Sequence, residues 1–157
     1  MNPAHDPPDG GYVLSEDPAR LDLALVHRWL STDAYWALGR ERDVVDRAFA
    51  ASVAVGVYRD GEQVAVARIV TDRATFAWLC DVYVDPAHRG RGLGTRLAGW
   101  ATAWAARHGV PRMVLATRDA HAVYATAGFA PLEGPQRYME IDKRPQRAAV
   151  LAALADG

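Results

Sequence analysis

Cysteine is almost absent from this chain of 157 residues, in which Cys80 is the only example. A single thiol can form neither an intrachain disulfide nor a cysteine-based metal site. The 5 histidines are scattered along the chain and show no spacing typical of metal ligands. We therefore expect no bound metal.

Long apolar runs and an excess of charge of one sign are also missing. No apolar segment approaches the ~20 residues that a membrane-spanning helix needs. Residues 1–11 are polar and rich in proline and glycine, unlike the apolar core of a signal peptide. The formal net charge is -1, so the chain has no strongly basic surface for nucleic acid. These features predict a cytoplasmic protein that binds neither membranes nor nucleic acid.

The length and composition are those of one globular domain with a substantial core, because 50% of the residues are apolar and 24% are charged. We expect a flexible lead-in over residues 1–11, a folded domain over 12–142 and an Ala-rich tail over 143–157 without a core role.

The order of elements follows from apolar periodicity and turn residues. A three-strand antiparallel meander over 52–84 is expected, with Asp60-Gly61 in its first hairpin turn. A helix over 93–108 ends at Gly109, and the apolar strand that follows over 112–117 is expected to be central and parallel to the strand before the helix. The other expected elements are a strand at 12–14, helices from 17 to 30, 43 to 51 and 120 to 127 (with Asp119 as N-cap), and a final hairpin of strands near 129–132 and 137–141.

The most informative stretch is Leu79 to Leu97, which reads as a strand, a glycine-rich loop and the start of a helix. The loop, R-G-R-G-L-G, precedes a helix N-terminus, where unpaired backbone N–H groups and the helix dipole attract anions. Glycines lack Cβ atoms and let phosphate oxygens approach those N–H groups. Arg89, Arg91 and Arg96 add positive charge, so the loop predicts a phosphate or pyrophosphate ligand.

Two common phosphate motifs do not fit this loop. A Walker A loop needs a lysine after its last glycine, and in a dinucleotide fingerprint that starts at Gly90 the third glycine position holds Thr95. The stretch instead resembles the GNAT superfamily of acyl-CoA-dependent N-acetyltransferases, whose motif [Q/R]-x-x-G-x-[G/A] is matched by Arg89-x-x-Gly92-x-Gly94. The preceding D-V-Y-V-D-P and the later A-T-R-D-A-H-A-V-Y-A-T-A-G-F fit the same family, and the resemblance covers about residues 12–142.

The resemblance implies an α/β (α+β) fold. This fold has a mixed, mostly antiparallel twisted sheet of about six to seven strands, helices on both faces, and a central parallel strand pair that splays apart. Acetyl-CoA is the implied co-substrate, with its pyrophosphate on the loop and its pantetheine arm paired to strand backbone. The implied cofactor-binding residues are Val82, Tyr83, Val84, Arg89, Gly90, Arg91, Gly92, Leu93, Gly94 and Thr95.

Tyr124 matches the tyrosine of the family's Y-x-x-x-G-F pattern and is the implied general acid for the departing coenzyme A thiolate. The general base stays open, with Asp81 and His121 as weaker candidates. Cys80 is expected to be a buried strand residue rather than a nucleophile. Tyr35, Trp36 and Trp78 are candidates for the acceptor pocket, whereas Trp29 is expected in the core.

The implied reaction is direct transfer of an acetyl group from acetyl-CoA to a primary amine of a small molecule or peptide, in a ternary complex. Two alternatives remain: a non-catalytic acyl-CoA sensor on the same fold, and a toxin-type enzyme that acetylates aminoacyl-tRNA. The near-neutral charge disfavours the second alternative. The sequence does not name the amine, and it is compatible with a homodimer.

Overall fold

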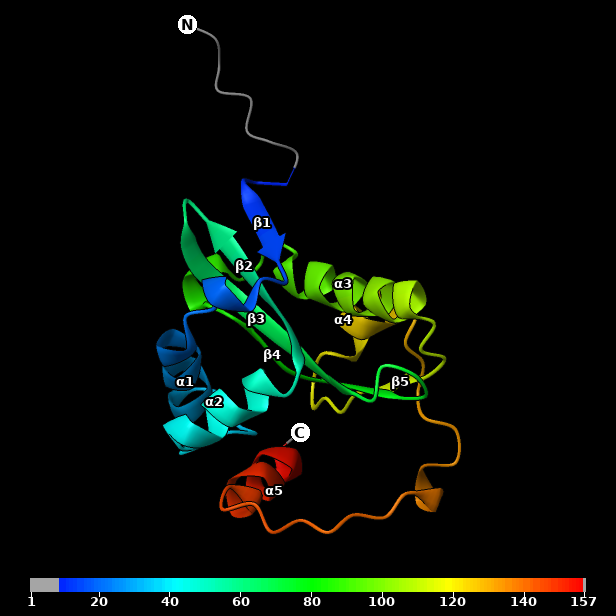
Figure 1. The fold of residues 1–157 in the computed structure, drawn as a ribbon. Coiled ribbons are helices and arrows are strands. Elements are labelled where there is room, and N and C mark those ends of the chain that lie inside the picture. The colour runs from blue at the N-terminus through cyan, green and yellow to red at the C-terminus, as the bar shows by residue number, and fades with distance from the viewer. Residues whose placement is uncertain (1–8, 157) are drawn as a thin grey trace, which may run out of the picture.

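The computed structural model describes residues 9–156, which fold around one five-stranded sheet with the order β1-β2-β3-β4-β5 (Figure 1). The first four strands are antiparallel neighbours, and β5 runs parallel to β4. The strands are β1 (Tyr12–Ser15), β2 (Val53–Arg59), β3 (Glu62–Thr71), β4 (Ala77–Val84) and β5 (Met113–Val114). The α-helices are α1 (Leu23–Thr32), α2 (Arg42–Ala50), α3 (Leu93–His108), α4 (His121–Thr126) and α5 (Arg147–Ala155), with short 3-10 turns at Pro18–Arg20, Pro86–His88 and Pro135–Arg137.

The hairpin between β2 and β3 confirms the meander expected from the sequence. Asp60 and Gly61 occupy the turn with φ of 51° and 83°, the positive values that a tight hairpin turn requires. β2 and β3 are buried over most of their length, because helices cover both faces of the sheet.

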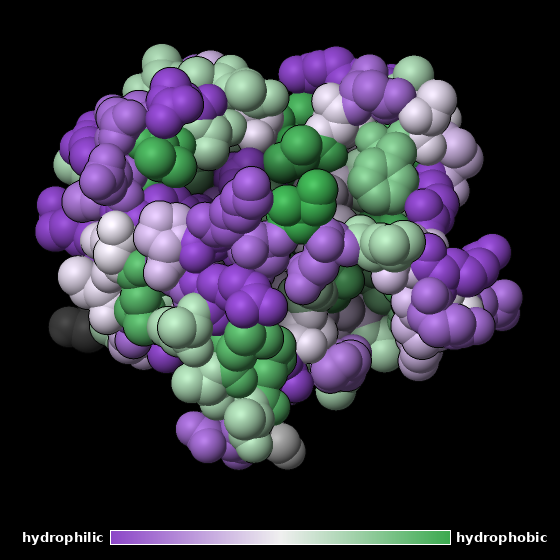
Figure 2. Space-filling model, turned by 90° about the horizontal axis from the view of Figure 1, so that it is seen from below, coloured by the Kyte–Doolittle hydropathy of each residue, from purple (hydrophilic) through white to green (hydrophobic). Residues whose placement is uncertain are grey.

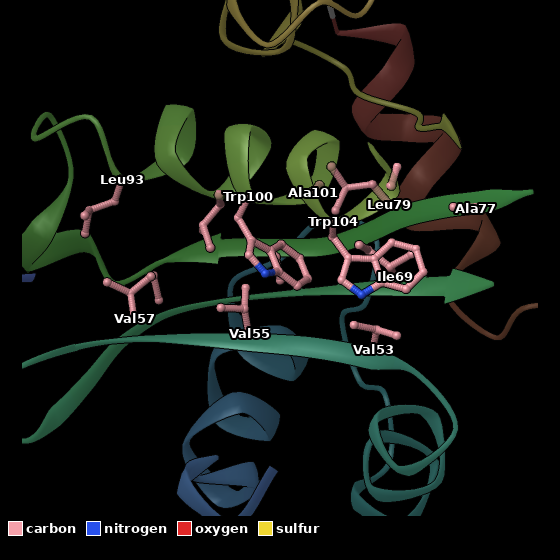
Figure 3. Close-up of a cluster of buried hydrophobic side chains, with 14 of the residues drawn as sticks. Val53, Val55, Val57, Ile69, Ala77, Leu79, Leu93, Trp100, Ala101 and Trp104 are labelled. Carbon is pink, nitrogen blue, oxygen red and sulfur yellow. The ribbon is translucent and has the colours of Figure 1, made fainter. Parts of the chain in front are cut away.

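The two faces of the sheet carry separate hydrophobic clusters. On one face α3 directs Leu93, Trp100, Ala101 and Trp104 onto the valines of β2 and onto Ile69 and Leu79 (Figure 3). On the other face α1 and α2 pack through Val26, Trp29, Leu30, Val45 and Phe49. Trp29 stacks on Tyr83 with ring centroids 5.4 Å apart, which confirms its expected place in the core.

Strands β4 and β5 separate soon after they begin. They pair only at Ala77 with Met113 and at Trp78 with Val114, although β4 continues to Val84. The expected parallel, splayed pair is therefore present. Its expected central position is wrong: β5 is the last strand of the sheet and has 2 residues, where a strand over 112–117 was expected.

The C-terminal part differs most from expectation. The predicted hairpin near 129–132 and 137–141 does not form, so the sheet has five strands rather than six or seven. Met139 and Ile141 are 97% and 90% exposed. Because neither side chain packs into the core or lies in the sheet, nothing favours a strand in this segment. The tail, for which no core role was expected, contains α5, and its Val150 is 8% exposed.

Seen from the side that Figure 2 shows, hydrophobic side chains form several small groups separated by hydrophilic ones. Among the described residues, no helix is long and apolar enough to cross a membrane.

Candidate active site

A cavity of about 640 Å³ opens where β4 continues beyond its pairing with β5. The end of β4 forms one wall, and the loop and first turn of α4 form another. The glycine-rich loop and the segment after α1 close the remaining sides. The lining residues include Asp33, Tyr35, Trp36, Val82, Tyr83, Val84, Arg89, Gly90, Gly92, Leu93, Gly94, Thr95, Arg118, Asp119 and Tyr124.

The glycine-rich loop is suited to bind an anion. Gly90 and Gly92 have φ of 73° and 76°, a left-handed conformation that favours glycine, and open space lies where a Cβ atom would be built on either residue. Gly92 is also the N-cap of α3, and no side chain caps the first turn of this helix. The N–H groups of that turn are therefore left for a ligand, which fits the pyrophosphate of coenzyme A.

Asp81 occupies a β-bulge that the sequence alone did not reveal. The register passes from Arg68 opposite Cys80 to Val66 opposite Tyr83, so β4 contains one extra residue there. The φ of Asp81 is 50°, and the bulge turns its side chain toward the face that α1 and α2 cover.

The Asp81 carboxylate is buried and fully engaged. It accepts hydrogen bonds from Arg40 at 2.9 Å, from Arg68 at 2.6 Å and from the Trp36 indole at 2.9 Å. Burial alone raises the pKa of Asp81, but the two guanidinium groups outweigh burial and hold the pKa below its usual value. A carboxylate stabilised in this way is a poor proton acceptor, and Asp81 does not line the cavity. The structure therefore argues against Asp81 as the general base, and its hydrogen bond instead fixes Trp36 in the cavity wall.

A second ionic cluster joins the loop to the end of α1. Asp33 accepts hydrogen bonds from the Tyr83 hydroxyl at 2.5 Å and from Arg89 at 3.2 Å. The Tyr83 hydrogen bond is the main cause of the lowered pKa of Asp33. Arg89 also donates to the Val84 carbonyl at 3.0 Å. The Arg89 side chain is therefore held against α1 and β4 rather than directed into the phosphate loop, and Asp33 is a site residue that the sequence did not suggest.

Tyr124 lies on α4 and lines the cavity, with its ring packed edge-on against Phe129 at a centroid distance of 5.9 Å. Burial, with a smaller contribution from the negative charge of Asp119, raises the pKa of Tyr124 to about 12. The hydroxyl is therefore protonated at neutral pH and is available as a hydrogen-bond donor.

The sequence profile of the acetyltransferase (GNAT) family matches residues 23–129, which is more than half of the chain. The chain belongs to the GNAT acetyltransferase family. A solved GNAT-family structure from Xanthomonas campestris pv. campestris is 44% identical with a TM-score of 0.79, and the match covers 83% of this chain and 92% of that one.

Two further proteins resemble the chain, one in sequence and one in fold alone. A candidate acetyltransferase from Gibberella zeae is 34% identical in an alignment of 104 residues that covers 54% of this chain and 59% of that protein's length. The crystal structure of a predicted acetyltransferase from Clostridium acetobutylicum with acetyl-CoA shares the fold, with a TM-score of 0.64 and 15% identity over 83% of this chain and 94% of that one.

Within this GNAT domain, several residues predicted to act in the site lie elsewhere. His121 begins α4, is exposed and does not line the cavity. Trp78 lies at the start of β4, where the strand still pairs with β5, and is 37% exposed outside the cavity. Both placements argue against the predicted roles. Arg91 is exposed beside the loop, and its predicted contact with the cofactor stays a prediction.

Two other expectations about GNAT site residues have clear outcomes. Asp119 does not cap α4, because the N-cap is Ala120, whose N–H donates to Thr117 Oγ1 at 3.0 Å. Burial raises the pKa of the Cys80 thiol to about 11, and Cys80 does not line the cavity, so it is unsuited to be a nucleophile.

Proposed function

We propose that this GNAT protein transfers an acetyl group from acetyl-CoA to a primary amine of a small molecule or peptide. The observation that carries the proposal is one continuous cavity that joins an uncapped, glycine-rich helix N-terminus to the hydroxyl-bearing side chain of Tyr124. An anion site and a protonated phenol in one cavity suit a ligand with a pyrophosphate at one end and a thioester at the other.

The residues that would hold acetyl-CoA follow from the fold. The N–H groups at the start of α3 would bind the pyrophosphate, with Gly90 and Gly92 allowing close approach. Strand β4 has no strand partner beyond Trp78 on its β5 side among the described residues, so the backbone near Val82 is available to pantetheine amides. Acetyl-CoA supplies an activated acyl group when bound.

We assign Tyr124 the role of hydrogen-bond donor to the departing sulfur. A thiol has a pKa of about 8.5, well below that of this phenol, so complete proton transfer from Tyr124 to a thiolate is unfavourable. A hydrogen bond that strengthens as negative charge builds on sulfur lowers the transition state without that transfer. The acceptor ammonium must lose its proton before the nitrogen can attack, and we propose solvent water in the open cavity as the acceptor of that proton.

The test compares Tyr124→Phe with wild-type protein in a thiol-release assay with acetyl-CoA and a panel of amines. The change keeps the ring and its contact with Phe129, so coenzyme A affinity should be nearly unchanged. The value of kcat should fall by roughly 10²–10³, as when one hydrogen-bond donor to a charge that develops in the transition state is removed. Tyr138→Phe is the matched control, because Tyr138 is 44% exposed and lies outside the cavity.

Full turnover of the Tyr124→Phe variant would remove this hydroxyl from the mechanism. Binding of coenzyme A by wild-type protein without thiol release on any amine would favour the sensor alternative.

A further inference from the structure

The wall of the cavity nearest Trp36 carries an arginine that none of the expected roles uses. Arg118 lines the cavity, and its guanidinium lies 4.4 Å from the centroid of the Tyr35 ring. Tyr35 packs edge-on against Trp36 at 5.1 Å, and Trp36 is held by Asp81. The buried Asp81 therefore holds Trp36, and Trp36 in turn supports the Tyr35 ring on which Arg118 stacks.

Arg118 keeps most of its donors free for a ligand. Stacking on Tyr35 uses the face of the guanidinium and leaves its edge available. Within the described residues, the Arg118 guanidinium donates one hydrogen bond, of 3.1 Å, to Asp119, whose own side chain is 67% exposed. The Arg118 side chain is only 36% exposed, so it is partly shielded from water. A stacked guanidinium with a free edge suits bidentate binding of a carboxylate.

The position of Arg118 points to the acceptor rather than to coenzyme A. Its aromatic support is tied to Asp81, whereas the phosphate loop follows the end of β4 beyond Val84. At 3.3 Å per residue, Asp81 and Val84 lie about 10 Å apart along β4, so the aromatic support and the phosphate loop adjoin different ends of this strand segment. Tyr35 and Asp119 line the same cavity as Tyr124, so this wall belongs to the cavity that contains the hydroxyl at which transfer is proposed.

We propose that Arg118 binds a carboxylate of the acceptor, and that the acceptor is therefore a small amino acid-like amine. The inference rests on the proposed acetyl transfer and deepens it. A carboxylate is favoured over a phosphate because Asp119 already offsets part of the guanidinium charge, and a single guanidinium can balance a monoanion but not a dianion.

The activity test uses amines in matched pairs with and without the carboxylate: lysine with cadaverine, and phenylalanine with phenethylamine. Wild-type protein should prefer the carboxylate-bearing member by about 10-fold to 100-fold in kcat/KM, the range expected for a hydrogen bond to a charged group. Arg118→Gln should abolish this preference through KM, leave KM for the decarboxylated amine unchanged and preserve coenzyme A affinity. Arg118→Lys should restore part of the preference, since it keeps the charge but not the fork.

The control is Arg47→Gln, which removes the same charge from an exposed pair on α2 with the arginine side chain 75% exposed. It should keep the full preference. Equal use of both members of each pair by wild-type protein, or an unchanged preference in Arg118→Gln, overturns the inference. Preference for phosphoethanolamine over the amino acids also overturns it, in favour of a phosphate-bearing acceptor.

A binding measurement separates this inference from the proposed function. Calorimetric titration of N-acetyl-lysine and N-acetyl-cadaverine, and of the corresponding phenylalanine pair, into protein saturated with coenzyme A needs no turnover. The carboxylate-bearing members should bind at least 10-fold more tightly than their partners, and Arg118→Gln should lose this difference. This result supports the carboxylate site even where no thiol is released. Equal binding within each pair, or no binding of either carboxylate-bearing member, overturns it.

Discussion

The buried cluster around Asp81 allows a quantitative test of how the cavity wall at Trp36 is held in place. Replacing Asp81 with Asn keeps the shape of the side chain but removes the negative charge between Arg40 and Arg68. The arginine side chains are only 17% and 13% exposed, and the Asp81 side chain is 1% exposed. Removing one partner of a buried ion pair costs about 3–5 kcal/mol, because the remaining charge is left uncompensated. We expect about 3 kcal/mol, since the amide oxygen still accepts hydrogen bonds.

This loss should appear in urea unfolding followed by tryptophan fluorescence, with an unchanged m-value. The corresponding fall in Tm is about 6–12 °C for a chain of this size. Asp46→Asn is the matched control, because Asp46 forms an exposed pair with Arg42 on α2 and its side chain is 45% exposed. The control should lie within about 0.5 kcal/mol of wild type.

The pH dependence gives the same test a second readout. The folded-state pKa of Asp81 lies below the unfolded value of about 3.9, so its stabilisation is present above that value. The stabilisation is lost as the pH falls through the folded-state pKa. The difference in unfolding free energy between wild type and Asp81→Asn should therefore be constant near neutral pH and shrink in acid.

Two results would refute this account of Asp81. A loss below about 1 kcal/mol at neutral pH would show that the cluster does not hold the fold as described. A normal Tm with kcat reduced by about 10²-fold or more would restore Asp81 as the general base.

Three further predictions follow from the loop, the ligand and the thiol. Gly92→Val should weaken coenzyme A binding sharply in calorimetry, because a branched side chain would enter the anion site. The control is Gly109→Val, which imposes the same backbone strain at φ of 66° beyond the other end of α3 and should leave the affinity for coenzyme A unchanged. Coenzyme A at a hundredfold excess over Kd should add roughly 2.7 kcal/mol of stability, seen as a higher Tm, and a larger shift with NAD or ATP would contradict the assigned ligand. Native Cys80 should resist alkylation by iodoacetamide at pH 8, because burial raises the pKa of its thiol to about 11. The Cys80→Ser variant should retain turnover, and loss of turnover with an intact fold would reopen a covalent route.

Features set by residues close together in the chain were predictable from the sequence. The helix of residues 93–108 begins after the glycine loop and ends at Gly109, whose φ is 66°, as its capping pattern predicted. The turn at Asp60-Gly61 was predictable for the same reason, and the parallel pair of strands around α3 followed from the rule for strand–helix–strand connections. The loop motif also identified the family, because an anion site at a helix N-terminus is built from one continuous stretch.

The roles of the charged side chains were decided only by tertiary structure. Asp81 meets Arg40, and Asp33 meets Arg89, across 41 and 56 positions of the chain. The direction of Asp81 depends on a bulge defined by the register of β4 against β3, and an alternating apolar pattern carries no mark of that extra residue. Likewise, the pattern near 137–141 is strand-like, but a strand forms only where a neighbouring edge pairs with it, and the structure provides no such pairing within the described residues. The sequence therefore predicted an anion site at the start of α3, whereas packing determined which charges hold the walls of the cavity.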